Sequence, residues 1–100
     1  LDDVEGGAVE RKQRKREEAE RRNRLSPLRS EMAGLERLLA RLEEERSRIE
    51  AELAAPDIYD PPARARLQEL LQEQGRIKRE IESAEAQWLS VAERLERESA

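Results

Sequence analysis

Basic side chains crowded near the N-terminus are the residues of this sequence best placed to do chemistry. The stretch from Glu10 to Arg24 holds eight of them against four acidic residues, a net charge of +4. They are Arg11, Lys12, Arg14, Lys15, Arg16, Arg21, Arg22 and Arg24. Such a density of cations can neutralise several phosphates of a nucleic acid without reading its sequence. The stretch has no aromatic residues for base stacking. The alternative is a solvated linker between domains.

A second candidate is Tyr59, which lies in a proline-rich break together with Asp57 and Asp60. Side chains at an exposed loop tip often take part in binding, so Tyr59 is a candidate tip contact. Packing of its ring over the ends of the neighbouring helices explains the residue equally well.

Catalytic and metal-binding residues are not expected. The chain has no Cys and no His, which removes thiol nucleophiles, imidazole bases and the usual zinc ligands. Its many glutamates fall on helix faces expected to be solvated, which supply neither the burial nor the fixed geometry that a catalytic pair of carboxylates needs. No glycine-rich phosphate loop is present. We therefore expect a non-catalytic segment with no cofactor of its own.

Two stretches of apolar residues, spaced three and four positions apart, predict the elements that carry these groups. The first stripe is Leu25, Leu28, Met32, Leu35, Leu39, Leu42, Ile49 and Leu53. The second is Leu67, Leu70, Ile77, Ile81, Ala84, Trp88, Val91 and Leu95. Residues 55–62 separate them and hold three of the four prolines, which neither helix can cross. Ser26 and Pro27 favour a helix start or a kink at the first stripe.

The expected fold is all-α: an antiparallel two-helix coiled-coil hairpin with a basic N-terminal arm, either helical or extended. The helices should cover about residues 27–54 and 63–98, with the tip at 55–62. We divide the chain into an acidic start with a basic linker arm, 1–24, and the hairpin, 25–100. Folding at the tip places Leu42 opposite Ile77. It also places Arg46 opposite Gln74, a polar layer that could fix the register.

The rest of the surface suggests other partners. Leu38, Leu71 and Leu89 lie beside the apolar seam, so the competing function is a structural spacer or a protein-interaction hairpin that binds no nucleic acid. Weak self-association is expected from a core this thin. The apolar runs are too short to cross a bilayer, so we expect no membrane contact and a cytoplasmic location.

The order of these features resembles a known family. Pro27 at the start of the first helix, the tip sequence PDIYDPP and Trp88 in AEAQWLSVAERLE are similar to the C-terminal coiled-coil domain of ABC-F ATPases, particularly the Uup and YheS type. The resemblance covers about residues 11–98. It implies an accessory domain that positions the protein on DNA or on ribosomal RNA and the ribosome. It also implies ATP-binding cassettes N-terminal to the domain in the same chain, which would bind ATP and Mg²⁺.

Overall fold

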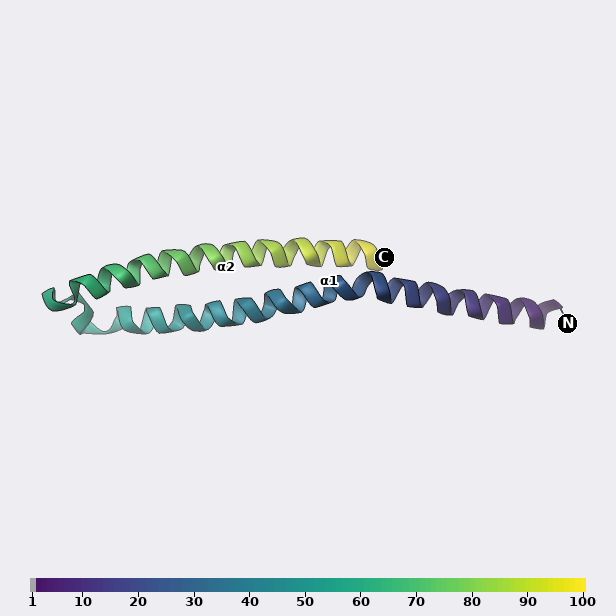
Figure 1. Cartoon of the computed structure of the whole chain (residues 1–100), viewed down its shortest axis with the longest axis horizontal. Helices are drawn as coiled ribbons and strands as arrows, with labels where there is room; N and C mark the ends of the chain where they lie inside the picture. Colours follow the sequence, from purple (N-terminus) through teal and green to yellow (C-terminus); the bar gives the residue numbers. More distant parts are fainter. Residues whose placement is uncertain (1) are drawn as a thin grey trace.

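Two long helices, packed side by side, form a rod. We describe a computed structural model, which places the backbone of residues 2–100 and the side chains of residues 7–100. Helix α1 runs from Asp2 to Ala54 and helix α2 from Arg64 to Ser99 (Figure 1). The rod measures 89 × 16 × 14 Å. The all-α antiparallel hairpin is thus confirmed.

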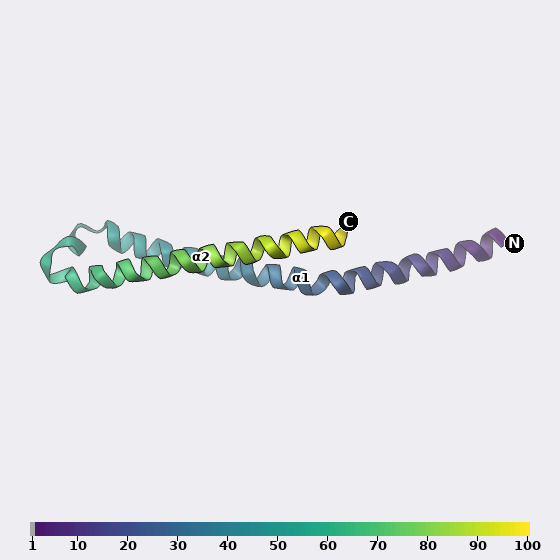
Figure 2. The same ribbon diagram turned by 90° about the horizontal axis from the view of Figure 1, so that it is seen from above.

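Helix α1 does not begin at Pro27, so of the two predicted alternatives the helix start is wrong, whereas the kink agrees with the structure (Figures 1 and 2). The helix begins at Asp2 and continues through Pro27 without interruption. Proline in a helix interior removes one N–H, here the one that would bond to the carbonyl of Asn23. The residues on both sides of Pro27 are helical, so the helix continues despite the missing hydrogen bond. Both views show α1 bending in this region (Figures 1 and 2). The basic arm is therefore helical, while the division of the chain at residue 24 stays a prediction.

The tip ends α1 and starts α2 through backbone hydrogen bonds. Two 3-10 turns, η1 (Pro56–Tyr59) and η2 (Pro61–Ala63), connect the helices. The N–H of Ala55 donates to the carbonyl of Glu52 at 3.2 Å, and the N–H of Ala63 donates to the carbonyl of Asp60 at 2.9 Å. Helix α1 stops at Ala54 as predicted, because Pro56 has no N–H with which to continue it.

The core is a single apolar seam between the helices, divided into two clusters. Near the tip lie Leu42, Ile49, Leu70, Ile77, Ile81 and Ala84, with Leu38, Leu39, Leu53 and Ile58 packed against them. Near the open end lie Leu25, Leu28, Leu35 and Val91, with Met32, Trp88 and Leu95. Leu70 and Ile77 are fully buried. Leu42 and Ile77 share a cluster, as the predicted register requires.

The predicted polar layer is not a buried contact. Arg46 and Gln74 line the same surface groove, so they lie at the same level of the rod. Both are exposed, and Arg46 instead forms ion pairs with Glu43 and, at 3.7 Å, Glu50 on its own helix. A long guanidinium at the edge of a two-helix seam can reach water, so it need not pair across the interface. The proposal that this pair fixes the register is therefore not supported.

The N-terminal part of α1 projects beyond the hairpin. Helix α2 ends at Ser99, and among residues 7–100 Leu25 is the first residue of α1 in a buried cluster. Both views show the preceding turns of α1 extending alone past the C-terminal end of α2 (Figures 1 and 2). Among the described residues, no helix is long and apolar enough to cross a membrane.

Candidate nucleic-acid interface

The eight predicted cations lie on the projecting part of α1, and all eight are exposed. None forms an ion pair with a carboxylate of residues 7–100. The sequence spacing favours pairs such as Glu17 with Arg21, but these two residues form no ion pair in the structure. The one side-chain hydrogen bond in this stretch joins Gln13 to Glu17 at 3.2 Å. The cations are therefore free to meet phosphates without first losing an ion pair within residues 7–100.

Helical structure in the arm follows from its composition and from its connection to the hairpin. Residues 8–24 consist mainly of Glu, Arg, Lys, Gln and Ala, which are strong helix formers. Forming the first turn is the costly step for an isolated helix, whereas adding turns to an existing helix is close to neutral. The hairpin supplies that existing helix, so the arm needs no apolar partner to continue it.

Tyr59 has a structural role at the tip. Its hydroxyl donates a hydrogen bond of 2.7 Å to the carbonyl of Leu53. That carbonyl belongs to the last turn of α1, where backbone acceptors have no partner within the helix. Tyr59 nevertheless remains 62% exposed, so part of its surface faces solvent. The structure thus supports the packing explanation, and the role of Tyr59 as a tip contact stays a prediction.

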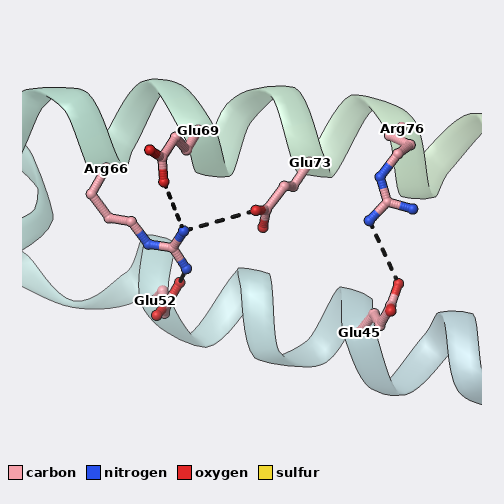
Figure 3. A network of polar contacts seen from close by, with 6 residues as sticks. All are labelled: Glu45, Glu52, Arg66, Glu69, Glu73 and Arg76. Atoms are coloured by element: carbon pink, nitrogen blue, oxygen red, sulfur yellow. Dashed lines mark hydrogen bonds and ion pairs between the residues drawn. The ribbon is translucent and has the colours of Figure 1, made fainter.

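An ion-pair network near the tip was missed in the sequence. Arg66 of α2 binds Glu52 of α1 at 2.6 Å, and it also contacts Glu69 at 3.2 Å and Glu73 at 3.8 Å (Figure 3). The hydrogen bonds that Arg66 donates to Glu52, and then to Glu69, stabilise its charged form and raise its pKa above the ordinary value. Because Glu52 and Arg66 are on different helices, the contact joins α1 to α2 beside the tip.

A second ion pair continues this link along the groove that Glu52 and Arg66 line. Arg76 of α2 approaches Glu45 of α1 at 3.8 Å (Figure 3). It also binds Glu80 on its own helix at 3.1 Å. In the sequence, these contacts were indicated only by residues of opposite charge that lie beside the apolar seam at matching positions along the two helices. That signal is weak in a chain of which 44% is charged, because most positions then have several candidate partners.

The three leucines of the competing interaction surface are not gathered together. Leu38 is half-buried and packs against the core cluster nearest the tip, in a groove with Glu45 and Arg76. Leu71 is exposed and lines a separate groove with Arg46 and Gln74. Leu89 is also exposed. Leu38 therefore contributes to the core, and it shares neither groove nor degree of exposure with Leu71.

Trp88 belongs to the hairpin core. It is half-buried and packs with Met32 against the cluster at the open end. Its indole N–H donates a hydrogen bond of 3.1 Å to Glu36 of α1. This arrangement buries much of the ring and satisfies its polar atom, so Trp88 is not a free stacking platform.

Comparison with known proteins identifies the hairpin. Residues 27–93 match the family model described as the ABC transporter C-terminal domain. The matched part contains the tip and most of the paired length of both helices, whereas the basic arm precedes it. Searches of curated proteins and of solved structures gave no significant match. The chain therefore belongs to the ABC transporter C-terminal domain family, as an accessory domain of an ABC protein.

Proposed function

We propose that this domain belongs to an ABC-F-type ATPase of the Uup or YheS kind and holds that protein on nucleic acid, either DNA or ribosomal RNA. The domain is non-catalytic. ATP and Mg²⁺ bind to cassettes elsewhere in the same chain, and the whole protein works in the cytoplasm. The family match supports membership of an ABC protein, and the resemblance in sequence suggests the ABC-F branch.

The projecting basic arm is the observation that carries the proposal. It is a helix with a net charge of +4, and it extends past the end of α2. From Leu25 onward the chain carries −5, which disfavours contact between the hairpin and phosphates. The arm is therefore the part of the molecule best suited to approach a nucleic acid, while the hairpin acts as a spacer behind it.

Salt-dependent binding tests the proposal. Arg11, Lys12, Arg14, Lys15 and Arg16 are changed together to Ala, and affinity for duplex DNA and for ribosomes is measured at several salt concentrations. If each cation meets one phosphate, the slope of log K against log salt should fall by up to about 4.5. The matched control removes five exposed hairpin arginines without ion pairs within residues 7–100. These are Arg37, Arg41, Arg48, Arg64 and Arg79.

The two variants have the same net charge, so a difference between them reflects where the charge lies. An unchanged affinity and salt slope in the arm variant would remove the arm as the contact. In that case the competing function, a spacer or protein-interaction hairpin, would be favoured.

A further inference from the structure

The net positive charge of the arm lies on one side of α1. Successive residues of an α-helix are rotated by about 100°, so each position in the helix has a defined direction. Between Glu10 and Arg24, one half of the circumference holds five cations, which we call the basic face. They are Arg11, Lys12, Lys15, Arg16 and Arg22. Glu18 is the only carboxylate on this half, and it lies at the border.

The other half of the same helix is electrically balanced. It carries three cations and three carboxylates. They are Arg14, Arg21 and Arg24 together with Glu10, Glu17 and Glu20. The net charge of +4 therefore belongs to the basic face, and the opposite half contributes none of it. A phosphate approaching the balanced half would meet as many negative as positive groups.

The basic face also points away from α2. Leu25 and Leu28 are buried against α2, and the helical rotation places them on the side of the balanced half. The basic face is thus the outer side of α1 and is not covered by the end of α2. Arg29, which is exposed, lies five turns beyond Arg11 and continues the row along the hairpin. From Arg11 to Arg29 the row is about 27 Å long.

We propose that the basic face, extended by Arg29, lies along the phosphate backbone of a double-stranded nucleic acid, while Arg14, Arg21 and Arg24 make no contact with it. This inference rests on the proposed function and adds the surface and the strandedness of the partner. A long one-sided row of cations on a stiff helix suits the regular phosphates of a duplex. The arm offers no aromatic side chain on which the bases of a single strand could stack. DNA and RNA duplexes share this phosphate chemistry, so both are tested.

Two triple variants with the same net charge test the proposal. One changes Arg11, Lys15 and Arg22 to Gln on the basic face. The other changes Arg14, Arg21 and Arg24 to Gln on the balanced half. Gln has a helix propensity close to that of Arg and Lys, so both variants should keep the helix, which circular dichroism checks. Binding to short duplex DNA and duplex RNA is measured by fluorescence anisotropy at several salt concentrations.

The basic-face variant should lose affinity on the order of 100-fold at about 0.1 M salt, and its salt slope should fall by about 2.7. The balanced-half variant should change by less than about fivefold, through screened long-range charge alone. Glu18→Gln should tighten binding more than Glu17→Gln, because only Glu18 borders the basic face. Equal losses in the two triple variants would overturn the assignment of the face and leave the proposed function standing. Failure of the unmodified protein to bind either duplex would overturn this inference, and failure to bind ribosomes as well would overturn the proposed function.

Discussion

Leu70 and Leu71 offer a direct test of the packing, because they are adjacent, identical in type and opposite in exposure. Leu70 is fully buried in the cluster nearest the tip, whereas Leu71 is 52% exposed. Truncation of a buried Leu to Ala costs about 2–5 kcal/mol, including the cavity that it leaves. The seam is only one layer thick and grooves flank it on both sides, so neighbouring side chains can relax into the space. We therefore expect Leu70→Ala to cost about 2–3 kcal/mol.

The control, Leu71→Ala, should cost about 0.5 kcal/mol or less. The exposed Leu71 side chain loses little buried apolar surface on truncation, and Ala is a slightly better helix former than Leu. The resulting difference of about 2 kcal/mol corresponds to about 8–16 °C in Tm for a domain of this size. Thermal and urea unfolding followed by far-UV circular dichroism measures both variants. Ile77→Val is a milder change at the other fully buried position, with an expected cost of about 0.5–1.5 kcal/mol.

Equal losses at Leu70 and Leu71 would refute this reasoning. They would mean that Leu71 is buried in solution, most simply in a complex between two hairpins. A Tm that rises with protein concentration in the unmodified chain, but not in Leu71→Ala, would locate the self-association at that surface.

Three further predictions concern the ends of the hairpin. Pro27→Ala restores the missing N–H to the helix interior, so ellipticity at 222 nm should increase, and a decrease would show that the arm does not continue α1 as a helix. Tyr59→Phe removes the hydrogen bond to the carbonyl of Leu53 and should cost about 0.5–1.5 kcal/mol in urea unfolding, whereas no loss would show that water replaces the hydroxyl without penalty. Arg66→Gln should lower Tm more at low salt than at high salt, while Arg64→Gln, whose arginine forms no ion pair with residues 7–100, should show no such difference. Equal salt responses in those last two variants would show that the Glu52 contact does not stabilise the hairpin.

The spacing of apolar residues and the positions of the prolines were sufficient to predict the hairpin. Period-3.5 spacing of Leu and Ile specified two helices with one buried stripe each, and the prolines of residues 55–62 could end them only there. Equal numbers of seam positions on either side of the tip then fixed which residues meet, as Leu42 and Ile77 do. The basic arm was evident from the sequence, because a cluster of Arg and Lys can be recognised without knowing the fold.

The tertiary structure decided those features for which the sequence allows more than one conformation or more than one partner. Pro27 is compatible with a helix start and with a helix interior, and the helical residues on both sides made it interior. Arg46 was expected across the seam from Gln74, but it forms ion pairs with carboxylates one turn away on its own helix. Ile58 reads as part of a polar loop, yet the turn folds it onto the end of the core. Only the continuous helix from Asp2 gives each basic residue a direction, and this direction separates a basic face from a balanced one. Sequence thus determined which segments pair, because apolar spacing is a local property, whereas the structure determined where each charge points, because that requires the path of the backbone.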